Sequence, residues 1–82
     1  METMMLYFHD NVFVVEFNGK VAETEDIKNL MKWMIHDMNI RLGDASSIAK
    51  MVMDNPAKGV LLAQTMSLDA GLALLGKLKE AV

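Results

Sequence analysis

The chain has 82 residues, 52% of them hydrophobic, and no cysteine. It is therefore long enough for one domain over residues 1–82, too apolar to be disordered, and unable to form disulfides or thiolate metal sites. Its formal net charge is −3 and its eight basic residues are scattered, so we expect no nucleic-acid binding, which needs a concentrated basic face. Glu2 stands where a signal peptide carries positive charge, and no apolar run is long enough to span a bilayer. We expect a cytoplasmic protein that does not enter membranes.

The N-terminal residues have the pattern of a β-hairpin with Asp10-Asn11 as a two-residue turn, which places His9 opposite Val12. Side chains alternate along a strand, so each face of the hairpin collects every second residue. One face is wholly apolar and consists of Met4, Leu6, Phe8, Phe13, Val15 and Phe17. The other face is mixed and consists of Met5, Tyr7, His9, Val12, Val14 and Glu16.

Asn18-Gly19 is a second turn signal, because this dipeptide readily takes the positive φ angles of a tight turn. The turn either ends the second strand or starts a short third strand at Lys20-Val21. We favour the first, because signals for a helix begin almost at once.

A first helix is predicted over residues 25–39. Thr24 is a suitable N-cap, and Glu25 and Asp26 place negative charge at the positive end of the helix dipole. Apolar residues then follow at the spacing of an amphipathic helix. They are Ile27, Leu30, Met31, Met34, Ile35 and Met38.

A shorter helix is predicted over residues 45–54. Gly43 can close the first helix and Asp44 can cap the second. Pro56 stops it, because the residue before a proline disfavours the helical region. Its apolar face consists of Ala45, Ile48, Met51 and Val52.

The C-terminal third is predicted to form a strand and a helix. The short apolar run Val60–Met66 follows Gly59 and precedes Ser67, which is a suitable N-cap for a helix from Leu68 to about Ala81. Gly71 falls within the apolar stripe of this helix and indicates that the helix lies close on the sheet. The stripe consists of Leu68, Gly71, Leu72, Leu75, Leu78 and Val82.

The predicted order is therefore β-β-α-α-β-α. Three strands would form one small antiparallel sheet, and three amphipathic helices would bury their apolar stripes on one of its faces. The predicted fold class is α+β, a two-layer sandwich with the other sheet face left open.

The order of elements from residue 25 onward resembles the α-α-β-α run of two related small folds. These are the C-terminal domain of the ribosomal stalk protein and the N-end-rule adaptor of the Clp protease. The matching segments are Ala45–Pro56, Gly59–Leu62 and Ser67–Ala70. Both folds end with a strand after the last helix, and the resemblance implies that the strand Met4–Phe8 takes that place here.

The chain departs from both families where their functional residues lie. The Clp adaptors carry an Asn-Asp-Asp-type turn before the first helix and a histidine in the second helix. This chain has Phe17–Lys20 at that turn and no histidine in its second helix. The stalk domains present a lysine-rich first helix to translation factors, whereas here only Lys28 and Lys32 remain beside acidic neighbours. Neither function is therefore carried over.

His9 and His36 are the two histidines, and each precedes an aspartate. Such a pair can orient an imidazole for base catalysis, and two pairs brought together can hold a metal. Adjacent residues on a helix point about 100° apart, however, so His36 and Asp37 do not face each other. We expect surface histidines, no enzyme activity, no metal and no cofactor. A ligand- or metal-binding protein that uses His9 and His36 is the alternative function.

Two features indicate protein–protein contact. Tyr7, Val12 and Val14 lie on the mixed hairpin face, and an apolar patch of this kind marks an interface. Trp33 falls about 240° round the first helix from Ile27, near the polar side, where a tryptophan can anchor a partner. We therefore predict a protein–protein interaction module, a homodimer through the sheet, with partner-binding residues Tyr7, Val12, Val14 and Trp33. The alternatives are that the last helix covers this face, and that Trp33 packs under a loop or against Ile40 and Arg41.

Overall fold

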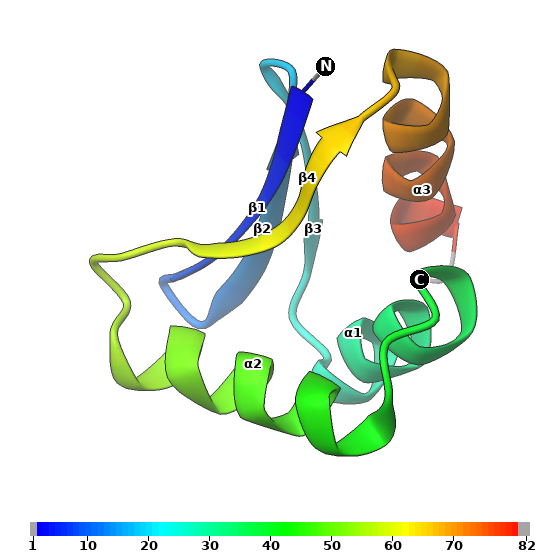
Figure 1. The fold of residues 1–82 in the computed structure, drawn as a ribbon. Helices are drawn as coiled ribbons and strands as arrows, with labels where there is room; N and C mark the ends of the chain where they lie inside the picture. Colours follow the sequence, from blue (N-terminus) through cyan, green and yellow to red (C-terminus); the bar gives the residue numbers. More distant parts are fainter. Residues whose placement is uncertain (1, 81–82) are drawn as a thin grey trace.

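Helices cover one face of a four-stranded antiparallel sheet (Figure 1). The computed structural model describes residues 2–80. The predicted α+β class, with a small antiparallel sheet and helices on one face, is confirmed. The strand order across the sheet is β3-β2-β1-β4. Along the chain the elements are β1 (Glu2–His9), β2 (Val12–Phe17), β3 (Lys20–Thr24), α1 (Ile27–Lys32), the π-helical turn η1 (Trp33–Asp37), α2 (Leu42–Asp54), β4 (Val60–Met66) and α3 (Leu68–Glu80).

The N-terminal hairpin has the predicted register. β1 and β2 pair from Met4 opposite Phe17 to His9 opposite Val12. The turn residues Asp10 and Asn11 have φ angles of 51° and 64°. Two successive positive φ angles match the right-handed twist of the flanking strands, and aspartate and asparagine tolerate them. The turn therefore fixes which side chains point to each face of the sheet.

The sheet has four strands rather than the predicted three. The turn at Asn18-Gly19 leads into β3, which pairs with β2 and places Ala22 opposite Val15. Both of these side chains are buried on the inner face. The expectation that this turn only ends the second strand is wrong, because the pairing with β2 stabilises a segment whose own residues give little strand signal. The predicted element order lacks this strand.

The first helix begins later than predicted. Thr24 lies in β3, and its hydroxyl accepts hydrogen bonds from the backbone of Asp26 at 3.2 Å and from the side chain of Asn29 at 3.1 Å. Asp26 is the N-cap instead, and its carboxylate accepts from the backbone N–H of Lys28 at 2.9 Å. Thr24 therefore joins the strand to the helix, while the negative charge still lies at the helix N-terminus.

The break between the first two helices also differs from the prediction. Asn39, with a φ angle of 60°, follows the π-helical turn. α2 then begins at Leu42, so Gly43 and Asp44 lie in its first turn rather than in the break. Asp44 accepts a hydrogen bond from the Arg41 guanidinium at 3.2 Å. Asn39, rather than Gly43, therefore closes the first helix, and asparagine tolerates the left-handed conformation.

The C-terminal elements follow the prediction closely. α2 ends at Asp54, before Pro56, and β4 spans Val60–Met66 as expected. The Ser67 hydroxyl accepts from the backbone N–H of Ala70 at 3.3 Å, as an N-cap does. α3 runs from Leu68 to Glu80, and Val82 of the predicted stripe lies outside the described residues.

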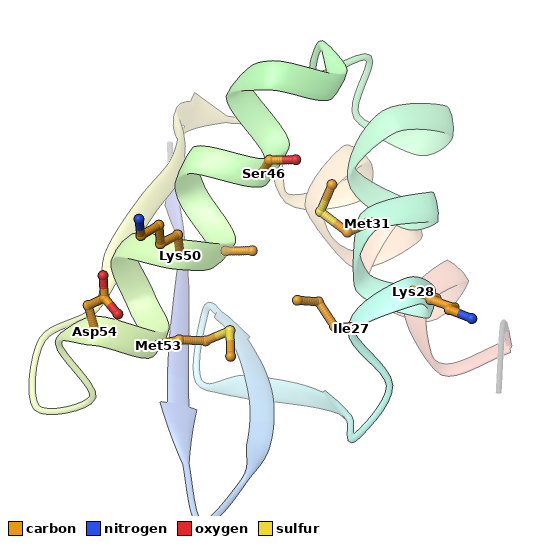
Figure 2. A pocket seen from close by; sticks show the side chains of 8 residues that line it. Ile27, Lys28, Met31, Ser46, Lys50, Met53 and Asp54 are labelled. Atoms are coloured by element: carbon orange, nitrogen blue, oxygen red, sulfur yellow. The ribbon is translucent and has the colours of Figure 1, made fainter.

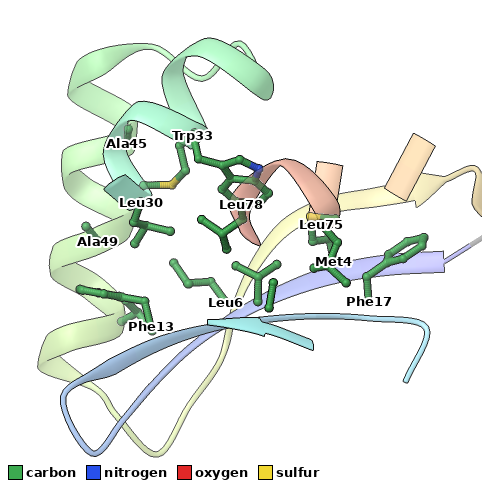
Figure 3. Close-up of a cluster of buried hydrophobic side chains, with 14 residues drawn as sticks. Met4, Leu6, Phe13, Phe17, Leu30, Trp33, Ala45, Ala49, Leu75 and Leu78 are labelled. Carbon is green, nitrogen blue, oxygen red and sulfur yellow. The ribbon is translucent and has the colours of Figure 1, made fainter. Parts of the chain in front are cut away.

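One continuous core lies between the sheet and the helices (Figure 3). Its close packing is clearest at Gly71 of α3, where a Cβ atom would run into the aromatic ring of Phe17. Phe17 is fully buried, so its ring has little room to move away. The predicted close approach of the last helix to the sheet is therefore confirmed. The buried apolar residues are Met4, Leu6, Phe13, Val15, Phe17, Ala22, Leu30, Trp33, Met34, Ala45, Ala49, Val52, Leu75 and Leu78.

This contact predicts opposite effects for two glycine substitutions in one helix. Alanine at either position raises helix propensity by up to about 1 kcal/mol. Gly76→Ala should keep most of that gain, because nothing lies within 4 Å of its added Cβ atom. Gly71→Ala should lower the free energy of unfolding by about 1–3 kcal/mol, because the Phe17 ring must shift. Urea denaturation of both variants measures the difference, and equal stabilisation by both would contradict the close contact.

Candidate functional site

The face of the sheet opposite the helices carries the candidate site, which we call the open sheet face. Its residues follow from the pairing: Tyr7 lies opposite Val14, and Glu16 lies opposite both Met5 and Val21. Leu61 of β4 lies opposite Met5 on the same side. α3 packs on the inner face through Leu75, Leu78 and Gly71, so the alternative in which the last helix covers the open sheet face is wrong.

Apolar side chains dominate this face. Val21 and Leu61, on the two outer strands, are 45% and 40% exposed. Met5, Tyr7, Val12 and Val14, on the two central strands, are partly buried by their neighbours. The face is therefore an apolar surface that residues 2–80 leave open to solvent.

Tyr7 is held in place on this surface. Its ring lies over Gly59, where an added Cβ atom would come within 2.5 Å of ring atom Cε1. The absence of a side chain at residue 59 leaves room for the ring beside the start of β4.

Charged and polar groups lie at the rim of the open sheet face. His9, next to the β1–β2 turn, is exposed, and its Nε2 atom lies 3.2 Å from a carboxylate oxygen of Asp10. Glu16 lies at the other end of the hairpin, and Glu23 of β3 is opposite Val14. One end of the hairpin face therefore carries an imidazole and the other end a carboxylate.

Trp33 does not lie at the surface, and its predicted role as a partner anchor is corrected. The indole is 1% exposed and lies among the core side chains (Figure 3). Its Nε1–H donates to the Leu74 carbonyl of α3 at 2.8 Å. The angle of 240° is measured from Ile27, a member of the predicted apolar stripe, but Ile27 is 41% exposed. The buried direction passes through Leu30, about 60° from Ile27 toward Trp33, because α3 packs on that side of η1.

This burial predicts the behaviour of the single tryptophan in solution. Emission from Trp33 in the folded protein should be blue-shifted relative to emission in urea, and acrylamide should quench it far less. Both effects follow because the indole is enclosed by core side chains. Fluorescence titration with acrylamide, with and without denaturant, measures the difference. Equal quenching in the two states would contradict the packing of Trp33 against α3.

The two histidines are not part of a metal site in the described residues. His9 lies beside the β1–β2 turn, whereas His36 lies in η1, and both are exposed. Across residues 2–80, no group of three or more histidine, cysteine, aspartate or glutamate side chains is arranged to hold a metal ion. Within the same residues, no helix has the length and apolar character needed to cross a membrane.

The structure has a second apolar surface that the sequence patterns did not reveal. A groove of about 520 Å³ lies between α1 and α2 (Figure 2), and we call it the α1–α2 groove. Ile27, which is in the predicted apolar stripe of the first helix, and Met53, which is outside the predicted apolar face of the second, line it and are exposed. Its lining residues are Ile27, Lys28, Met31, Ser46, Ala49, Lys50, Met53 and Asp54.

Comparisons of the chain with models of known families, with curated proteins and with solved structures find no significant match. The resemblance to the stalk domain and the Clp adaptor therefore stays a prediction. The resemblance gives the first strand the place of the families' last strand. In the structure this strand, β1, lies between β2 and β4, in the middle of the sheet.

Proposed function

We propose that this chain is a small cytoplasmic, non-enzymatic protein–protein interaction module that forms a homodimer through the open sheet face. The observation that carries the proposal is that all helices pack on the inner face, which leaves Tyr7, Val12 and Val14 on an uncovered apolar layer. Val21 and Leu61 extend this layer to both outer strands. An apolar layer of this extent, rimmed by charged groups, is typical of an interaction surface.

A second copy of the chain suits this face in shape and size. Four strands spaced about 4.8 Å apart and about six residues long span roughly 19 by 20 Å. A twisted sheet of that size can pack against an identical sheet at a spacing of about 10 Å. The area, about 380 Å² per copy, is below that of standard stable interfaces, so the dimer would be weak and would dissociate on dilution. A twofold dimer would also enlarge the small core of an 82-residue chain.

The two possible twofold arrangements differ in which side chains they bring together. With the twofold axis running across the strands, the turn end of one hairpin lies over the opposite end of its partner. His9 of each copy then lies near Glu16 of the other. The alternative axis, parallel to the strands, brings the Glu16 carboxylates together and is disfavoured by their repulsion.

Substitutions on the open sheet face test the proposal. The parent should sediment as a dimer at high micromolar concentration, and Val14→Glu should raise the dissociation constant at least ten-fold, because two carboxylates would be buried near the twofold axis. Sedimentation velocity over a dilution series measures this change. Leu42→Glu is the matched control, since Leu42 is 65% exposed at the start of α2 and lies away from the sheet.

A second variant separates loss of association from loss of folding. Val21 is 45% exposed and lies opposite Glu16, so Val21→Lys places a favourable charge pair within the monomer. The variant should keep the circular dichroism of the parent and still weaken the dimer. A parent that stays monomeric at high micromolar concentration, or a dimer that both variants leave intact, would refute self-association through this face.

A further inference from the structure

The α1–α2 groove is an apolar channel between two helices of the helical layer. Ile27 and Met31 line it from α1, and Ala49 and Met53 line it from α2 (Figure 2). Ile27 and Met53 are 41% and 42% exposed, which is high for large apolar side chains that flank one concave surface. Methionine side chains adapt to different partners because they are unbranched and flexible. This lining is suited to receive apolar side chains from another molecule.

The charges beside the groove are mainly positive. Lys28 on α1 and Lys50 on α2 lie on opposite sides of it (Figure 2). Both lysines are exposed, and the ion pairs found among residues 2–80 involve neither of them. Asp54, at the C-terminal end of α2, is the single acidic residue of the lining. An apolar ligand with carboxylates along both of its sides would therefore match the groove in charge.

The groove is lined by two helices, and their backbone limits what kind of peptide can bind. Both walls are helices, whose backbone N–H and C=O groups are largely used within the helices. An extended peptide would find few backbone partners here, whereas a helix satisfies its own backbone hydrogen bonds. On α2 the lining runs from Ser46 to Asp54, about 12 Å along the helix axis. That length accommodates apolar side chains at positions i, i+3, i+4 and i+7 of a bound helix.

We propose that the α1–α2 groove binds an acidic amphipathic helix of a partner protein. The apolar stripe of that helix would lie on Ile27, Met31 and Met53, and its flanking carboxylates would pair with Lys28 and Lys50. This site is separate from the open sheet face and does not require the homodimer. It gives the chain a surface for a different protein in addition to the surface for a second copy.

The test uses a designed peptide and methionine methyl signals in NMR spectra of the full chain. The probe is a 15-residue helix-forming peptide with leucine at i, i+3, i+4 and i+7 and glutamate on both flanks. A twin peptide has lysine in place of each glutamate. The acidic probe should shift the methyl signals of Met31 and Met53 and bind at least ten-fold more tightly than its twin. Met51 is the internal control, because it is exposed on α2 but does not line the groove.

Charge-reversal variants test the role of the two lysines. The double variant Lys28→Glu/Lys50→Glu should bind the acidic probe at least ten-fold more weakly and prefer the basic twin. Lys58→Glu is the matched control, because Lys58 is exposed before β4 and lies outside the lining. It should bind the acidic probe as the parent does. The double variant and the control change only exposed side chains, and circular dichroism checks that both fold.

Several results would overturn the proposal. These are no shift at Met31 and Met53 at millimolar probe, equal binding of the two peptides, or an equal loss of binding in the Lys58→Glu control. Shifts of Met31 and Met53 on dilution of the chain alone would also overturn it, because the groove would then be covered by a second copy. Met5 reports on the open sheet face in the same spectra. Failure of this proposal is thereby distinguished from failure of the homodimer proposal.

Discussion

The antiparallel register of β1 with β2 decides which side chains the helices can cover. The positive φ angles of Asp10 and Asn11 close the hairpin in two residues and set this register. A shift of one residue would turn Phe13, Val15 and Phe17 toward solvent and leave the helices no apolar face. β3 and β4 then extend the same inner face from either side.

Two contacts fix the helical layer on this face. Gly71 brings the backbone of α3 against the Phe17 ring, and the Trp33 indole donates a hydrogen bond to the Leu74 carbonyl. The first contact lets α3 lie close to the sheet, and the second joins α3 to η1 by a hydrogen bond. With α3 placed in this way, the buried side of the first helix turns toward Trp33 and away from Ile27. Ile27 is left free to line the α1–α2 groove.

The protein therefore presents two apolar surfaces on opposite layers, and they differ in shape and symmetry. The open sheet face extends across all four strands, and its proposed partner is an identical copy. The α1–α2 groove is concave, lies between two lysines, and suits a narrow ligand of opposite charge. Because one surface belongs to the sheet and the other to the helices, a homodimer would leave both of its grooves accessible to a partner.

Features that depend on neighbouring residues could be predicted from the amino-acid sequence. The hairpin register, the strand Val60–Met66 and the Ser67 cap follow from local turn chemistry and from side-chain alternation. Gly71 revealed the close approach of the last helix because a glycine within an apolar stripe indicates a tight contact.

Features that depend on residues far apart in the chain could not be predicted in this way, because they arise from packing between elements. β3 forms because β2 offers it hydrogen-bonding partners, although the sequence of residues 20–24 gives little strand signal. Trp33 is buried because α3, which follows it by more than thirty residues, covers that side of the helix. The α1–α2 groove is lined by residues 27–31 and residues 46–54, which lie side by side only in the folded chain. Helical periodicity shows that a helix has an apolar side, but neighbouring elements decide how much of that side is covered.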